Sequence, residues 1–73
     1  MTLRELAPGQ RFEFVDKQTA LHFDGSRHFI GPGGTYTYLG VSNGCPVVLV
    51  ERDGSKPRLV PGTYERYVTV LFR

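Results

Sequence analysis

The sequence predicts a small all-β domain, and two features of its 73 residues support this class. Short runs of β-branched and aromatic residues recur along the chain, and the dipeptides Asn43-Gly44 and Asp53-Gly54, which are typical of hairpin turns, separate three of these runs. The first ten residues end at the turn pair Pro8-Gly9, so at most one helical turn fits there. We therefore expect strands joined by turns and no long helix.

The composition is that of an ordinary soluble globular chain. Nine Lys and Arg residues face seven Asp and Glu residues spread along the whole sequence, which gives a formal net charge of +2. A dedicated nucleic-acid-binding domain concentrates more positive charge than this. The longest apolar run, residues 46–50, is far too short to cross a bilayer. Because Cys45 has no second cysteine to pair with and no signal-peptide pattern opens the chain, we expect a cytoplasmic protein with a single domain over residues 1–73.

Five segments have the composition of strands, and one short segment has that of a helical turn. Phe12 and Phe14 alternate with polar residues in the first segment, as in a half-buried strand. Pro57 indicates an edge strand or an irregular start in the fourth segment. The predicted strands cover residues 11–15, 35–41, 45–51, 56–60 and 67–72, and the helical turn covers residues 61–65. The predicted core consists of Phe12, Phe14, Leu39, Val48, Val50, Leu59, Val68, Val70 and Phe72.

The order of these segments resembles that of an SH3-like barrel. A loop of about twenty residues follows the first strand, and residues 61–68 (PGTYERYV) stand where such barrels have a single helical turn before the last strand. The resemblance implies a five-stranded SH3-like barrel with a long first loop and a one-turn helix before the last strand. Residues 8–12 (PGQRF) and 36–40 (YTYLG) also resemble passages in uncharacterised accessory proteins of bacteria, phages or mobile elements. A shared fold of this kind does not define a function.

The long loop contains two His-Phe pairs around Asp24-Gly25-Ser26, and we expect a small hairpin there. A three-residue loop over residues 24–26 would place His22 opposite His28 on one face, about 5 Å apart, where two imidazoles could share a metal or sense pH. A two-residue turn at Gly25-Ser26 would place the histidines on opposite faces, with no site between them. The sequence leaves both registers open.

No residue pattern points to a metal, a cofactor or a catalytic group. A metal needs three or four ligands, and Cys45 and Asp24 are the only obvious additions to the two histidines. The glycine-rich residues 31–34 lack the Gly-Lys-Ser/Thr ending of a phosphate-binding loop. Ser, His and Asp occur together in residues 22–28, but neighbours in a hairpin turn cannot adopt the geometry of a catalytic triad. We therefore expect a protein that is not an enzyme, although the long loop remains a natural place for binding.

Four tyrosines are the most prominent candidates for a binding surface. Tyr36 and Tyr38 share a face of one predicted strand, and Tyr64 and Tyr67 flank the last turn. Beside the long loop they predict an aromatic platform on which a peptide or single-stranded bases stack, with packing at the rim of the barrel as the alternative. The candidate binding surface comprises Tyr36, Tyr38, Tyr64, Tyr67, His22, His28, Arg27 and Arg58.

These observations predict a small non-enzymatic binding or adaptor module with a protein as its partner. The chain has no tryptophan, which SH3 domains use to hold proline-rich peptides, so a ligand of that kind is not favoured. The alternative function is weak binding of single-stranded nucleic acid through the tyrosines together with Arg52, Lys56 and Arg58. Acidic residues interleave with these cations, which favours a protein partner.

The last predicted strand carries two further possibilities. Plasmid-encoded type II dihydrofolate reductases are similar in size and fold and build a shared pore from four small barrels, but residues 68–71 (VTVL) stand where these enzymes have Val-Gln-Ile-Tyr. An enzyme of that kind is therefore a remote alternative. An outward strip of Tyr67, Thr69 and Leu71 predicts self-association into a homo-oligomer, unless the long loop covers the strip.

Overall fold

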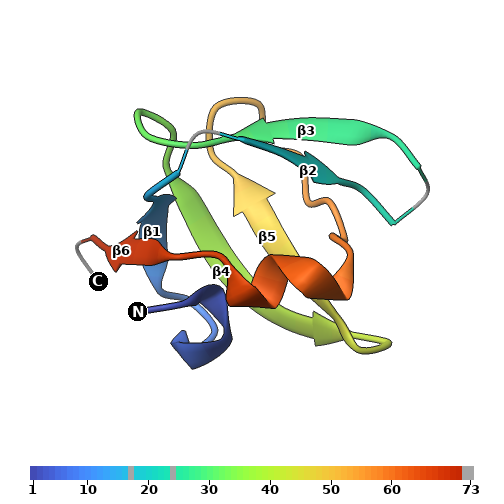
Figure 1. The fold of residues 1–73 in the computed structure, drawn as a ribbon, viewed down its shortest axis with the longest axis horizontal. Helices are drawn as coiled ribbons and strands as arrows, with labels where there is room; N and C mark the ends of the chain where they lie inside the picture. The colour runs from blue at the N-terminus through green and yellow to red at the C-terminus, as the bar shows by residue number, and fades with distance from the viewer. Residues whose placement is uncertain (17, 24, 72–73) are drawn as a thin grey trace.

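The fold is described from a computed structural model, which covers residues 1–16, 18–23 and 25–71, with the backbone alone for residues 18–20, 28 and 29. Strands and short 3₁₀ helices account for all regular structure in these ranges, which confirms the all-β class (Figure 1). The strands are β1 (Arg11–Phe14), β2 (Gln18–Leu21), β3 (Arg27–Ile30), β4 (Tyr36–Ser42), β5 (Cys45–Val50) and β6 (Val68–Val70), and the helices are η1 (Leu3–Glu5) and η2 (Pro61–Glu65).

Four of the strands form one antiparallel sheet in the order β5-β4-β1-β6. Strand β1 lies inside this sheet, so that Phe12 has Tyr36 of β4 on one side and Val70 of β6 on the other. Strands β2 and β3 pair only with each other within the named strands, and their hairpin lies at one end of the sheet, opposite η1 (Figure 1). The predicted long loop after the first strand is therefore a structured hairpin.

The predicted strand over residues 56–60 does not form a continuous strand. Isolated bridges replace it: Ser55 pairs with Val50, and Arg58 pairs with Val47. Pro57 explains the interruption, because it has no backbone N–H to donate, although its carbonyl accepts a hydrogen bond from the Val48 N–H at 3.2 Å. The predicted helical turn over residues 61–65 is confirmed as η2.

The inner face of the sheet packs an aromatic cluster. The rings of Phe12 and Phe14 meet edge to face with 5.1 Å between centroids, and Tyr36 stacks on Phe12 at 5.7 Å. Six of the nine predicted core residues are buried, Val70 packs partly buried against them, and Phe72 lies outside the described residues. The buried hydrophobic cluster consists of Leu3, Leu6, Phe12, Phe14, Ile30, Tyr36, Tyr38, Val48, Val50, Leu59, Tyr64 and Val68.

The placement of Leu39 in the core is wrong, and a β-bulge in β4 is the reason. The register with β5 passes from Tyr38 opposite Val48 to Gly40 opposite Val47, so Leu39 is the extra residue. Tyr38 takes the inward position, and Leu39 is left 39% exposed. Beyond the bulge, the Asn43-Gly44 turn forms as predicted, with φ angles of 51° and 79° that suit a two-residue hairpin loop.

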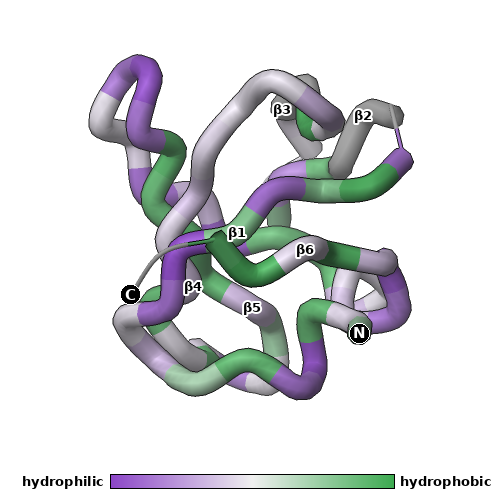
Figure 2. The backbone as a smooth tube through the Cα atoms, turned by 90° about the vertical axis from the view of Figure 1, so that its left-hand side faces the viewer, coloured by the Kyte–Doolittle hydropathy of each residue, from purple (hydrophilic) through white to green (hydrophobic). Residues whose placement is uncertain are grey.

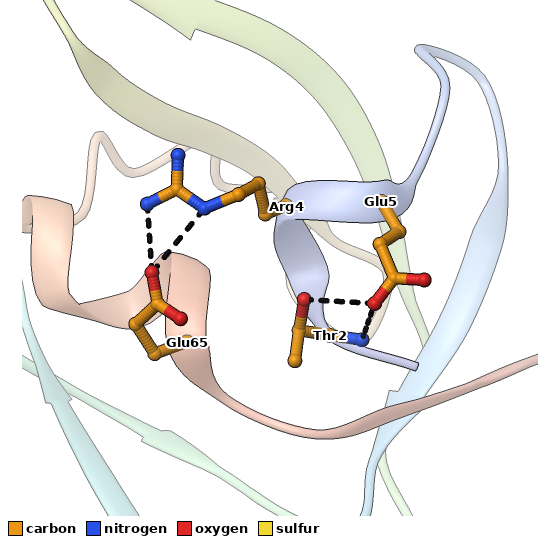
Figure 3. A network of polar contacts seen from close by, with 4 residues as sticks. All are labelled: Thr2, Arg4, Glu5 and Glu65. Carbon is orange, nitrogen blue, oxygen red and sulfur yellow. Dashed lines mark hydrogen bonds and ion pairs between the residues drawn. The ribbon is translucent and has the colours of Figure 1, made fainter.

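A polar network at the surface joins the two 3₁₀ helices (Figure 3). Arg4 of η1 donates from Nη2 to Oε2 of Glu65 at 2.7 Å, and from Nε to the same oxygen at 3.2 Å. Glu5 accepts from the backbone N–H of Thr2 at 3.0 Å, and this hydrogen bond is the main reason that the pKa of Glu5 is lowered. Beneath this network Leu3 is fully buried. Figure 2 shows the matching pattern along the chain, with hydrophobic stretches mainly on the strands and hydrophilic ones on the turns.

Candidate functional site

Three of the four tyrosines predicted for the binding surface lie in the core. Tyr36, Tyr38 and Tyr64 are 4%, 5% and 8% exposed. The shared face of Tyr36 and Tyr38 is confirmed, but it is the inner face of the sheet, where Tyr36 packs between the two phenylalanines of β1. Tyr67 alone is exposed, at 59%. The four-tyrosine platform is therefore wrong, because these rings fill the interior of a thin domain.

Neither of the two expected hairpin registers forms. Leu21 lies opposite Arg27, and Ala20 lies opposite His28, so His22 and His28 are not cross-strand neighbours. His22 bridges instead to Leu59 on the other side of β2, outside the hairpin. The direct cross-strand pairing of His22 with His28, on which a shared metal site depends, does not form. In the part of the chain that the structure describes, which excludes Asp24, no three His, Cys, Asp or Glu side chains come together as metal ligands.

The β2–β3 hairpin and the segment that follows β5 together form an apolar and basic surface that we call the hairpin face, made up of Leu21, Phe23, Arg27 and Arg58. Leu21 and Phe23 are 47% and 50% exposed, and each lies beside an arginine. Arg27 lies directly across from Leu21 on β3. The guanidinium carbon of Arg58 lies 4.2 Å from the centroid of the Phe23 ring, a cation–π contact. The surface is therefore held in place by its own contacts.

Backbone hydrogen bonds hold the hairpin face to the body of the protein. The Phe23 N–H donates to the Arg58 carbonyl at 2.7 Å, and the Val60 N–H donates to the Leu21 carbonyl at 3.2 Å. The Leu59 N–H donates to the Pro46 carbonyl at 2.8 Å, which links the same segment to β5. Residues 58–60 thus connect the hairpin to the sheet, with Leu59 buried between them while Leu21 of β2 and Phe23 of the following turn stay exposed.

The charges of the hairpin face are not neutralised within the described part of the protein. Two other arginines have carboxylate partners, Arg4 with Glu65 and Arg11 with Glu51. Arg11 binds both carboxylate oxygens of Glu51 at 3.0 Å, and this contact lowers the pKa of Glu51. By contrast, neither Arg27 nor Arg58 forms an ion pair with a described carboxylate. An acidic partner would meet two cations beside two exposed apolar side chains.

Tyr64 is a core residue with an unusual hydroxyl. No hydrogen-bond partner for its oxygen is found among the described residues. The pKa of Tyr64 is raised to about 12, mainly because burial disfavours the phenolate; Tyr38 and Cys45 contribute in the same direction, and the Arg4 guanidinium, 5.1 Å from the ring centroid, opposes them. Burial also raises the pKa of Tyr36. Both shifts favour the neutral phenol in the folded state.

We expect the protein to lose stability in alkali as pH rises from 10 toward 12, because the unfolded tyrosine ionises near 10 and the folded Tyr64 near 12. The stabilising contribution is complete below pH 10 and lost above the folded pKa. Urea unfolding at several pH values in this window measures it. Tyr64→Phe should show a shallower alkaline decline than the wild type, with Tyr36 contributing to the decline that remains. Parallel declines in the two proteins would contradict the assignment to Tyr64.

Tyr67 lies at the other edge of the four-stranded sheet, away from the hairpin face. Its carbonyl accepts a hydrogen bond from the Val15 N–H at 3.0 Å, and both side chains are about half exposed. Thr69 is exposed and Leu71 is half-buried, so the predicted strip on the last strand is only partly at the surface. Self-association through this strip stays a prediction.

No protein-family model, curated protein or solved structure matches the chain. The residues that the structure describes include no helix long and apolar enough to span a membrane. The choice of the hairpin face as the candidate site therefore depends on its geometry and chemistry alone.

Sequence reasoning found part of this surface and missed the rest. Arg27, Arg58 and His22 were expected at a binding surface, and they do come together around the hairpin, with His22 half-buried beside the exposed residues. Leu21 and Phe23 are not among the predicted site residues, because the face on which they lie depends on the hairpin register, which the sequence leaves open. The sequence carries one signal for their exposure. Residues 16–20 contain too few apolar residues for a strand that is buried on both faces, which indicates that one face of the strand ending at Leu21 is exposed. The side chain of His28 lies outside the described residues.

Proposed function

We propose that this chain is a non-enzymatic binding module of the cytoplasm and that the hairpin face is its contact with a protein partner. The observation that carries the proposal is Phe23, half exposed and stacked by Arg58, beside an exposed Leu21. A pre-positioned aromatic ring with an adjacent arginine is the chemistry of an interface hot spot. Because Arg27 and Arg58 have no described carboxylate partner, the proposed partner is an acidic protein segment with apolar residues.

A protein partner is favoured over single-stranded nucleic acid by what the surface offers. Binding of successive bases requires several exposed aromatic rings along a basic groove. Three of the four tyrosines are buried, and Tyr67 lies away from the hairpin face, so Phe23 is the sole aromatic ring beside these cations among the described side chains. A single aromatic ring, with two arginines that lie beside apolar side chains, suits a peptide better than single-stranded nucleic acid.

We further propose that the fold is an SH3-like barrel. Support comes from the order of pairing: β1, β4, β5 and residues 55–58 are successive antiparallel neighbours, η2 follows, and β6 returns to pair with β1. The β2–β3 hairpin occupies the long first connection. In this arrangement the interrupted segment around Pro57 takes the position of the fourth strand of the barrel.

The proposed function is tested with synthetic peptides. The probe is an acetylated and amidated peptide of about eight residues that alternates Glu and Val, measured by fluorescence anisotropy beside its Lys-Val counterpart and an oligothymidylate. We expect the acidic peptide to bind and the basic one not to. Phe23→Ala should weaken binding about tenfold or more, as for a central aromatic contact. Tyr67→Ala, which also removes an exposed aromatic ring, should leave the affinity unchanged.

Two results would contradict the proposed function. The first is equal affinity of the wild type and Phe23→Ala for the acidic peptide. The second is preferential binding of the oligothymidylate with an affinity that falls steeply between about 50 and 200 mM salt, which is the behaviour of phosphate contacts. In that case the nucleic-acid alternative would replace the protein partner.

A further inference from the structure

Strand β3 has one edge paired with β2 and one edge open. In Figure 1 it is the outermost strand of the hairpin, with no strand beyond it. The His22 N–H donates to the Ser26 carbonyl at 2.6 Å, which sets the alternation of the ladder. Leu21 and Arg27, one step along, are therefore a pair whose backbone groups point away from each other. The bond from the Val60 N–H to the Leu21 carbonyl agrees with this geometry.

The same alternation directs the backbone N–H and C=O of Arg27 toward the open edge of β3, and those of Phe29 follow two residues on. From the described part of the chain, no hydrogen bond reaches the Arg27 backbone at this edge. Unpaired backbone groups on an edge strand are a template for an added strand. Addition of an extended peptide to an exposed edge is a common mode of peptide recognition.

Arg27 places this open edge beside the hairpin face. Its side chain lies across from Leu21, so a residue that pairs with Arg27 on a new strand would present its own side chain on the same face. An acidic residue there would meet the Arg27 guanidinium, which has no described carboxylate partner. Residues at alternate positions of the new strand would share that face.

We propose that the partner of the hairpin face is an extended acidic segment that pairs antiparallel with β3 along its open edge, an inference that rests on the proposed function. In a hydrogen-bonded antiparallel pair, the residue opposite Arg27 directs both its backbone groups to β3 and its side chain to the hairpin face. The acidic residues of the segment are therefore also those that donate backbone hydrogen bonds. The residues between them point their N–H groups away from β3 and their side chains to the opposite face, so the aliphatic part of the acidic side chains supplies the contact with the apolar residues of the hairpin face.

The residues whose side chains face Arg27 are also those whose backbone N–H groups bond to β3. N-methylation of the alternating Glu-Val peptide at one residue type or the other therefore tests the strand pairing. One derivative carries N-methyl groups on the two central Glu residues and the other carries them on the two central Val residues. We expect N-methylation of Glu to weaken binding about tenfold, since it removes two backbone hydrogen bonds, and N-methylation of Val to change the affinity less than about twofold. On the protein, Arg27→Gln should weaken binding about two- to fivefold, while Arg66→Gln, an exposed arginine away from the hairpin face, should not.

The outcomes separate this inference from the proposed function. If the unmodified peptide binds through Phe23 and both N-methylated derivatives bind equally well, strand addition is overturned and the binding module stands. If methylation of Val weakens binding and methylation of Glu does not, the antiparallel pairing is overturned. If the unmodified peptide does not bind at all, the proposed function itself fails.

Discussion

Replacing Phe12 by alanine is expected to lower the free energy of unfolding by about 3–5 kcal/mol. The ring is fully buried, lies between β4 and β6 at the centre of the sheet, and contacts the rings of Phe14 and Tyr36. Its removal leaves a cavity that strands held on both sides cannot close. A chain of 73 residues has a total stability of only about 4–11 kcal/mol, so the variant should be largely unfolded or melt far below the wild type.

Urea unfolding followed by far-ultraviolet circular dichroism measures this loss. Val41→Ala is the matched control, because Val41 also lies in a strand but is 64% exposed, and its change should stay within about 0.5 kcal/mol. A Phe12→Ala variant as stable as the Val41→Ala variant would show that the aromatic cluster is not the centre of the core.

Replacing Gly40 by alanine is expected to cost about 1–3 kcal/mol through the backbone alone. Gly40 has a φ of +133°, a conformation that residues with a side chain rarely adopt. A Cβ atom added there would meet no other atom within 4 Å, so steric contact contributes nothing. The loss measures the strain of the β-bulge that turns Leu39 outward and Tyr38 inward.

Gly62→Ala is the control for this prediction. A Cβ at Gly62 also meets nothing within 4 Å, but its φ lies outside the positive range. The substitution should be neutral or stabilise by about 0.4–1 kcal/mol, because it restricts the unfolded chain. Equal stabilities of the Gly40→Ala and Gly62→Ala variants would contradict a strained bulge. A relaxed bulge in the Gly40→Ala variant would appear as new burial of residue 39.

The sequence was most informative about local structure. The alternation around Phe12, the Asn43-Gly44 turn and the helical turn at residues 61–65 each depend on a few neighbouring residues, and the structure confirms them. The prediction for Leu39 is wrong because the position of a bulge depends on how β4 pairs with β5. The residue types alone do not indicate which residue of β4 is left without a partner in β5. Leu3 and Ile30 were missed because short segments outside the sheet reach the core only through distant contacts.

The candidate site was less accessible for the same reason. Tyrosines in a strand fit a surface platform and a core equally well, and only the pairing of Tyr36 with Phe12 decides between them. The hairpin register depended on residues far along the chain, since Leu21 and Phe23 are hydrogen-bonded to the segment that contains Arg58 and Val60. These distant hydrogen bonds cannot be inferred from the sequence of the hairpin alone.

The pairing of β1 with β6 also bears on how the chain acquires its structure during synthesis. Residues 12–14 pair with residues 68–70, so one side of β1 has no partner until residues 68–70 have left the ribosome. Sheets closed by contacts of such long sequence separation fold slowly compared with helical domains. Until then the inward side chains of β1, Phe12 and Phe14, lack the cover of Val68, and the nascent chain presents an apolar strand edge to other molecules. Synonymous codon changes that slow translation of residues 68–70 are thus expected to lower the soluble yield without changing the folded protein.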